Sequence, residues 1–298
     1  SDVATAHTAI VDQVVEVDEE LMARYLEQGE VSPEQLHAPF EKALREGHLI
    51  PVCFTSAKEG VGVDDLLEIM VKTLPNPTEG NPRPFVKGDP ENPKAEEFHA
   101  TPDPKQHVLA HVFKITTDPF VGKLALFRIH QGTITKDSQL FIGEASKPFK
   151  VGHLFKVHGK EHKEVDAGIP GDICAVAKVE DIFFDAVLHD SHDEDNIHLR
   201  PLHFPMPMSG LAIESKSRGD EQKVGQALTR MAAEDPCFKV EHNAITKELV
   251  IRGLGDLHLR MILEKMKNRY HVEVDTRPPK IPYRETVLGK AEGHHRHK

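Results

Sequence analysis

The order of hydrophobic patterns between residues 203 and 278 limits the possible folds of this chain more than any other feature. Two amphipathic helical patterns occur there, and the second places Leu259, Ile262, Leu263 and Met266 on one face. Short β-type runs precede, separate and follow the helices, at residues 210–216, 237–242, 248–252 and 270–275. The resulting order β-α-β-β-α-β predicts a ferredoxin-like split βαβ domain. Because this fold hosts many activities, it does not indicate a function by itself.

Short runs of alternating apolar and polar residues fill residues 107–200. One of them lies in DPFVGKLALFRIHQGTI, residues 118–134, where Asp118-Pro119 predicts a turn because proline restricts φ. Gly122 then begins a strand and Gly132 ends it. Turn residues recur at intervals typical of a barrel, so we expect a closed or nearly closed antiparallel β-barrel.

Residues 1–75 have mostly helical patterns. Ser32-Pro33-Glu34-Gln35 predicts a capping box with proline at the first helical position. We expect a short apolar strand at residues 48–55, the loop SAKEGVG at residues 56–62 and an amphipathic helix up to residue 74. Strand, loop and helix together make part of an α/β sheet. One strand cannot be a sheet, so we expect further residues before the first one.

Residues 76–106 are rich in proline and charged or small residues, which predicts an extended linker without a helix. The whole chain is therefore predicted to be a multidomain α+β protein. It would combine a partial α/β segment, an antiparallel β-barrel and a ferredoxin-like domain.

Composition excludes several classes of protein. The net charge of −11 argues against a broad surface that wraps nucleic acid. No run of 18 apolar residues occurs, so we expect no membrane span. Cys53, Cys174 and Cys237 are dispersed in apolar runs without CxxC spacing, which predicts reduced core thiols in a cytoplasmic protein and no zinc knuckle.

Four blocks of sequence together resemble elongation factor G, a translational GTPase that acts on the ribosome. FTSAKEGVGVDDLLEIMVKTLPNP resembles the end of its GTPase domain, and HVFKITTDPFVGKLALFRIHQGTI resembles its second domain. FPMPMSGLAIESKSRGDEQKVGQALTRMAAEDPCFKV and IRGLGDLHLRMILEKM resemble its third domain, and IPYRETV the start of its fourth. The helical pattern before SAK resembles the insertion in the GTPase domain of this family. The resemblance implies a fragment that ends in the first strand of a fourth domain, at residues 279–298.

The predictions about nucleotide binding follow from this resemblance. In the intact protein, Ser56, Ala57 and Lys58 would form the loop beside the guanine base, with GTP or GDP and Mg²⁺ as cofactors. The chain as given contains no GxxxxGK[ST], NKxD or DxxG motif. We therefore expect no bound cofactor and no GTP hydrolysis by this chain, although the intact relative would couple GTP hydrolysis to translocation or a related step of translation.

The expected partners are ribosomal RNA and ribosomal proteins, with the chain itself monomeric and not bound to a membrane. Arg128 and the turn containing Gly253, Gly255 and His258 are our predicted ribosome or interdomain contacts. A solvent-facing barrel position is the simpler interpretation of Arg128. The end of the chain, with His294, His295 and Arg296, is a further predicted contact, since residues 277–298 hold six Lys or Arg against two Glu. A purification tag is the alternative origin of these histidines.

Other interpretations stay open from sequence. A binding or assembly module without any nucleotide partner is the main alternative, and a metal-dependent enzyme that uses the histidine-rich loops is another. HGKEH has HxxxH spacing but lies in a strand pattern, and the run HDSHDEDNIH at residues 189–198 lacks the glycine and terminal glutamate of an EF-hand. Gly253-Leu254-Gly255 resembles part of GxGxxG, but a tight strand-to-helix turn explains it better. We thus expect neither a metal site nor catalytic residues.

Overall fold

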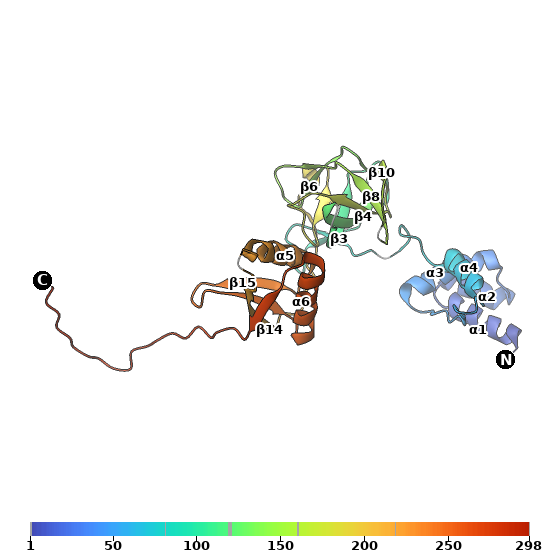
Figure 1. Cartoon of the computed structure of the whole chain (residues 1–298). Helices are drawn as coiled ribbons and strands as arrows, with labels where there is room; N and C mark the ends of the chain where they lie inside the picture. Colours follow the sequence, from blue (N-terminus) through green and yellow to red (C-terminus); the bar gives the residue numbers. More distant parts are fainter. Residues whose placement is uncertain (1, 81, 119–120, 160, 218, 298) are drawn as a thin grey trace.

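The computed structural model describes residues 2–80, 82–118, 121–159, 161–217 and 219–297. Pro119 of the predicted turn lies outside these residues. Figure 1 shows a helical unit at the N-terminus, a curled antiparallel sheet in the middle, a unit with two helices beside a sheet, and an extended C-terminal segment. The predicted α+β class is confirmed.

Four helices make up the N-terminal unit: α1 (Val3–Val15), α2 (Glu19–Gln28), α3 (Pro33–Glu46) and α4 (Val63–Thr73). The predicted capping box begins α3. The Gln35 amide donates to Ser32 Oγ at 3.4 Å, and the Ser32 amide donates to Gln35 Oε1 at 3.0 Å. A small core of Val11, Val15 and Leu21 joins α1 to α2.

The prediction of a strand at residues 48–55 is wrong. The described residues form only an isolated bridge between Ser56 and Val61 in this region, and Phe54 is 92% exposed. Helix α4 buries none of its residues, so Leu67 and Val71 of its apolar face are also exposed. A strand needs a ladder of backbone hydrogen bonds, and apolar alternation alone does not supply the neighbouring strand.

The proline-rich segment, predicted to be an extended linker, forms two strands that the sequence analysis missed. Strands β1 (Phe85–Lys87) and β2 (Glu96–Phe98) pair with each other, and β1 pairs with β13 (Ile197–Leu199). The antiparallel order is β13-β1-β2. Phe85 and Leu199 are register partners and belong to one small core with Leu109.

The middle unit, which we call the barrel, contains a curled eight-stranded antiparallel sheet with the order β7-β6-β12-β3-β4-β11-β8-β9 (Figure 1). A two-stranded ladder of β5 and β10 accompanies it, and residues of both sheets share one core. At β10 the backbone passes very close to this core, because a Cβ on Gly168 would lie 2.7 Å from Ile129 Cδ1 and 2.8 Å from Cys174 Sγ. The strands are β3 (Leu109–Asp118), β4 (Gly122–Gln131), β5 (Ile134–Thr135), β6 (Gln139–Ile142), β7 (Phe149–Lys150), β8 (Leu154–His158), β9 (Glu161–Glu164), β10 (Ala167–Gly168), β11 (Ile173–Ala177) and β12 (Val187–His189).

The predicted split βαβ domain is confirmed. Its strands pair in the order β15-β16-β14-β17, and both helices pack their apolar faces into the core. The last strand begins later than predicted because α6 continues to Tyr270, where His271 adopts φ +55 and ends the helix. The elements are β14 (Ser209–Ser215), α5 (Glu221–Glu234), β15 (Lys239–Asn243), β16 (Glu248–Gly253), α6 (Asp256–Tyr270) and β17 (Val274–Arg277).

A polar contact joins the barrel to the split βαβ domain. The Thr117 amide of β3 donates to Glu234 Oε1 of α5 at 2.7 Å. Arg269 of α6 donates to both carboxylate oxygens of Glu234, at 3.0 and 3.1 Å. We call this group of Thr117, Glu234 and Arg269 the interdomain clasp. Ala233 packs on the barrel core beside it.

The strand predicted for residues 279–298 is not formed within its described part, residues 279–297. The Lys280 amide donates to Glu248 Oε2 at 2.9 Å, which holds the start of this segment against the domain. Beyond it the chain extends away from the folded units, and Val287 and Leu288 are almost fully exposed. A lone extended segment gains no ladder, for the same reason as residues 48–55.

Candidate functional site

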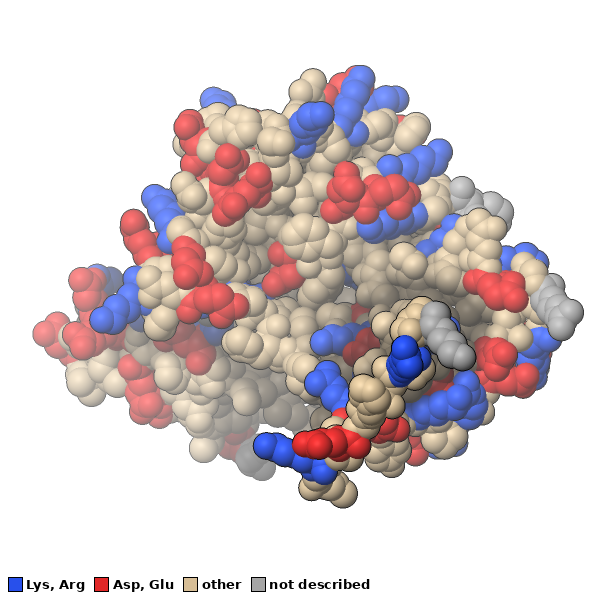
Figure 2. All heavy atoms as spheres, turned by 90° about the vertical axis from the view of Figure 1, so that its left-hand side faces the viewer, with Lys and Arg blue, Asp and Glu red and all other residues tan. Residues whose placement is uncertain are grey.

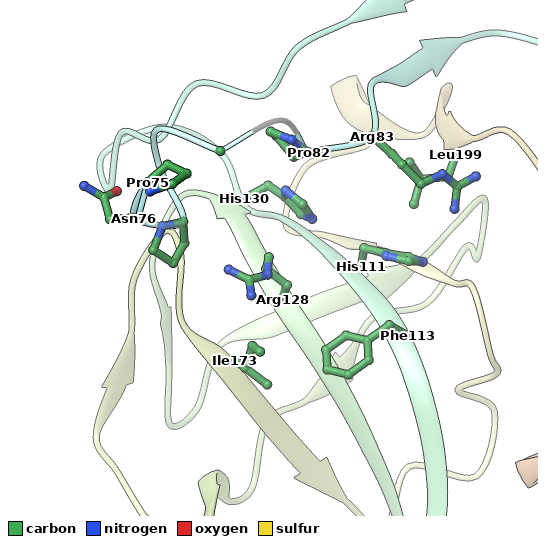
Figure 3. Close-up of a pocket in the computed structure, with 12 residues that line it drawn as sticks. Pro75, Asn76, Pro82, Arg83, His111, Phe113, Arg128, His130, Ile173 and Leu199 are labelled. Atoms are coloured by element: carbon green, nitrogen blue, oxygen red, sulfur yellow. The ribbon is translucent and has the colours of Figure 1, made fainter. Parts of the chain in front are cut away.

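A cavity of about 570 Å³ opens on the outer face of the barrel. Strand alternation explains its lining, because Phe127 and Ile129 point into the core while Arg128 and His130, next to them on β4, point outward. Arg128 faces His111 across the β3–β4 ladder and Ile173 across the β4–β11 ladder. Figure 3 shows these side chains around one space. We call it the barrel cavity; its lining residues are Pro75, Asn76, Pro77, Gly80, Pro82, Arg83, His111, Phe113, Arg128, His130, Ile173 and Leu199.

Arg128, the predicted contact residue of the barrel, is half-buried and anchored at one end of its guanidinium group. Its Nη1 donates to the carbonyl of Gly171 at 3.0 Å. Gly171 has φ +93, a conformation that glycine adopts without strain. Arg128 is therefore more ordered than a freely solvated barrel arginine. The structure gives it a defined direction into the cavity (Figure 3).

His130 is neutral at physiological pH. Burial lowers its pKa from 6.5 to about 4, and the neighbouring His111 and Arg128 add to the shift by repelling a positive charge. The ring meets Phe85 edge to face, with centroids 5.3 Å apart. A neutral imidazole offers one donor and one acceptor nitrogen, so His130 can hydrogen-bond to a polar ligand without carrying charge.

One carboxylate, that of Asp185, lies among the nitrogen-bearing side chains near the cavity. His111 Nε2 is 2.7 Å from Asp185 Oδ1, and Arg83 Nη1 is 3.9 Å from the same oxygen. Arg83 also donates to the carbonyl of Arg200. Two guanidinium groups, those of Arg83 and Arg128, therefore line the barrel cavity, and that of Arg83 lies beside the Asp185 carboxylate. Sequence reasoning missed His111, His130 and Arg83, and the outward alternation around Arg128 was the available signal.

The turn at residues 253–258 is a second predicted contact, and the structure shows how it is held together. Leu254 donates its amide to His258 Nδ1 at 3.2 Å, and His258 Nε2 is 2.9 Å from Asp235 Oδ2. A Cβ on Gly253 would lie 3.0 Å from His258 Nδ1, so glycine permits the close approach. Gly255 is the N-cap residue of α6. Both ring nitrogens of His258 are thus used within the domain.

Three exposed apolar side chains in or just after this turn were missed by sequence reasoning: Leu254, Leu257 and Met261. Leu257 and Met261 are four residues apart on the side of α6 opposite its buried stripe, and Leu254 lies just before the helix; this spacing was the signal that could have found them.

The remaining predicted residues lie elsewhere. Ser56, Ala57 and Lys58 form a turn in the helical unit, where Ser56 Oγ accepts the Glu59 amide at 3.4 Å. The terminal residues His294, His295 and Arg296 lie in the extended segment and are exposed. Gly253, Gly255 and His258 lie together at the start of α6. The helical unit with residues 56–58, the C-terminal segment, and strand β4, which carries Arg128, lie in other parts of the molecule (Figure 1).

The face that bears the C-terminal segment has mixed charge. Figure 2 shows Lys and Arg interspersed with Asp and Glu over it, without one continuous basic surface. The mixed charge of this face agrees with the net charge of −11, so any basic contact would be local.

The histidine-rich segments offer no metal site in the part of the chain that the structure describes, where no group of three or more His, Cys, Asp or Glu side chains could hold an ion. His189 is buried, and its ring nitrogens lie 2.8 Å from the carbonyl oxygen of Ser191 and 2.7 Å from that of Gly143. The metal-dependent interpretation therefore has no geometric support among these residues. One part of the cysteine prediction is also wrong, since Cys53 is exposed, whereas Cys174 and Cys237 are buried.

Comparison with known proteins identifies the two folded modules. Residues 107–186 match elongation factor G domain 2, and residues 204–278 match elongation factor G domain III. The crystal structure of a Thermus thermophilus protein is similar with a TM-score of 0.74 and 32% identity. That match covers 93% of this chain and 38% of the Thermus chain, so the chain spans well under half the length of that relative.

The barrel and the split βαβ domain that follows it are thus modules of a translation factor. The chain belongs to the elongation factor G family. None of the helices within the described residues has the length and apolar composition that crossing a membrane requires.

Proposed function

We propose that this chain is the part of a translational GTPase that contacts the ribosome through its barrel and its split βαβ domain. The observation that carries the proposal is the succession of domains 2 and III of elongation factor G in their family order, joined by the interdomain clasp. The expected setting is the cytoplasm, with ribosomal RNA and ribosomal proteins as partners.

In the complete protein we propose that GTP, bound with Mg²⁺, is hydrolysed on the ribosome to drive translocation or a related step. Because this chain contains no phosphate-binding motif, its own contribution would be to bind the ribosome and to transmit a change of domain orientation. Ser56, Ala57 and Lys58 would lie on the guanine side of that nucleotide.

Ribosome co-sedimentation tests the proposal. The purified chain should pellet with ribosomes at about 50 mM salt and dissociate by about 200 mM, since contacts to phosphates weaken as salt competes for them. The chain alone and an unrelated protein of equal charge are the controls. Absence of co-sedimentation at low salt would reject ribosome binding. Salt-insensitive binding to a protein partner without ribosomes would instead favour the assembly-module alternative.

A further inference from the structure

A cavity of about 560 Å³ lies where the barrel meets the split βαβ domain, beside the interdomain clasp. The barrel contributes the end of β3, the start of β4 and the residue after β11, and the other domain contributes α5, which lies next to β3, and the end of α6 (Figure 1). We call it the junction cavity; its lining residues are Thr117, Asp118, Val121, Gly122, Lys178, Arg230, Arg269 and Tyr270. A ligand that filled this space would touch both domains at once.

Three cationic side chains line the junction cavity, and they come from both domains. Lys178 follows β11 of the barrel, Arg230 lies on α5 and Arg269 on α6. Arg269 is paired with Glu234 in the interdomain clasp. The side chains of Lys178 and Arg230 form no ion pair and no hydrogen bond within the described residues. Like charges that line one cavity repel each other, so an anion bound among them would stabilise the junction.

Carboxylates limit the positive charge of the junction cavity. Asp118 is part of the lining, and its Oδ1 accepts the Val121 amide at 2.9 Å. With Glu234 of the interdomain clasp counted as well, three cations face two carboxylates and one positive charge remains. A small excess of charge suits a small anion bound with moderate affinity better than a highly charged polymer.

Two of the three cations are held in place by their surroundings. Lys178 has φ +62, a left-handed conformation that costs energy in residues other than glycine. Its amide donates to the Lys123 carbonyl at 3.0 Å, which supports this conformation. Such strain occurs most often where a side chain must be positioned for a ligand. Arg269 is held by Glu234 and by the ring of Tyr270, whose centroid is 5.5 Å from the guanidinium carbon.

We propose that the junction cavity binds a small phosphate ester and thereby holds the barrel and the split βαβ domain in one relative orientation. A phosphate group carries about 1.5 to 2 negative charges at neutral pH and three acceptor oxygens, so donors from two sides can share it. Arginine binds it with paired N–H groups. The volume of about 560 Å³ lies in the range of small-ligand sites and leaves room for the organic part of the molecule. The inference goes beyond the proposed function, because it assigns a ligand that is not part of the ribosome.

Binding is measured by titrating the whole ¹⁵N-labelled chain with glycerol 2-phosphate at constant ionic strength. The amide signals of residues 117, 122, 178, 230 and 269 should shift with one common Kd. Arg230→Gln should raise this Kd about tenfold, the lower end of what a charged hydrogen bond contributes. Arg260→Gln removes the same group from an exposed position of α6 outside the cavity and should leave the Kd within about twofold.

A second variant separates loss of binding from loss of folding. Lys178→Gly removes a cation at a position whose backbone conformation glycine adopts without strain. It should therefore weaken binding about tenfold without lowering the thermal midpoint of the free chain. A Kd unchanged in both Lys178→Gly and Arg230→Gln would overturn the site.

The effect on domain orientation is measured at the Thr117 amide, which donates to Glu234 across the junction. With glycerol 2-phosphate at ten times its Kd, exchange of this amide should slow about tenfold, because the ligand stabilises the closed junction by mass action. At the same concentration, the Arg230→Gln variant should show a slowing of only about twofold. Binding that leaves the exchange rate of Thr117 unchanged would refute the control of orientation.

Three comparisons identify the ligand class. Sodium chloride that reproduces the shifts would indicate general screening of charge and overturn the site. Citrate that binds as tightly as glycerol 2-phosphate would refute the preference for phosphate, and a single-stranded RNA hexamer that binds the same residues more tightly would refute a small free ligand. None of these measurements uses ribosomes, so their failure and the failure of ribosome co-sedimentation are independent results.

Discussion

Removal of the Glu234 carboxylate should loosen the junction between the barrel and the split βαβ domain while both keep their folds. In the interdomain clasp, Glu234 accepts the Thr117 amide from one domain and the Arg269 guanidinium from its own. Its side chain is 12% exposed and that of Arg269 is 30% exposed. Glu234→Ala leaves the Thr117 amide without this acceptor, in a residue that is only 8% exposed.

The expected cost follows from the two contacts. A hydrogen bond from a buried amide to a charged acceptor contributes roughly 1.5–3 kcal/mol. A partly exposed ion pair adds at most about 1 kcal/mol. Glu234→Ala should therefore destabilise the junction by about 3 kcal/mol. Glu234→Gln keeps an acceptor for Thr117 and loses the charge, so its cost should be about half as large.

Hydrogen exchange of the Thr117 amide measures this cost directly. An opening free energy lowered by about 3 kcal/mol speeds exchange on the order of 100-fold under conditions of fast reclosing. Glu264→Ala, at an exposed glutamate of α6, is the matched control and should leave the Thr117 amide unchanged. A double-mutant cycle with Arg269→Met should report a coupling of about 1 kcal/mol. Equal protection of Thr117 in the Glu234→Ala and Glu264→Ala variants would refute the clasp.

Three further predictions concern single residues. Between pH 6.5 and 4 the unfolded chain binds a proton on His130 that the folded chain excludes, so the free energy of unfolding should fall by roughly 3 kcal/mol as the pH is lowered over this range. His130→Gln should flatten that part of a plot of the urea midpoint against pH, and an unchanged plot would contradict the prediction. Gly132→Ala should lower the free energy of urea unfolding by about 4 kcal/mol, because φ is +75 and the new Cβ would lie 2.7 Å from the Cα of Val108. Gly143→Ala, where the Cβ meets open space, is the control and should cost about 1 kcal/mol. Equal costs would show that the structure relieves the contact at Gly132. Cys53 should react with a thiol reagent in the folded chain, whereas Cys174, whose pKa is raised by burial to about 11, should react only after unfolding; rapid labelling of both would contradict the buried placement.

The sequence predicted α3 and the split βαβ domain because capping and hydrophobic periodicity depend on residues close together in the chain. Helix α3, capped by Ser32, carries the hydrogen-bond partners of its first turn in the four consecutive residues 32–35. The split βαβ order was readable because each of its six elements has a clear period.

Features that depend on distant partners were not predictable in this way. The apolar run at residues 48–55 has strand composition but no neighbouring strand among the described residues. Strand β1 is three residues long and pairs with β13 more than a hundred residues later, which no local pattern reveals. The barrel cavity likewise depends on the register that places His111 opposite Arg128.

The β1–β13 ladder has a practical consequence for dividing the protein. Phe85 and Leu199 are partners, so the chain enters and leaves the middle unit at adjacent positions. A truncated version that started at residue 107 would lack β1, so β13 would lose its pairing partner and Leu109 of the small core would become exposed to water. A version of the barrel expressed alone should therefore begin before residue 83, so that β1 is present to pair with β13.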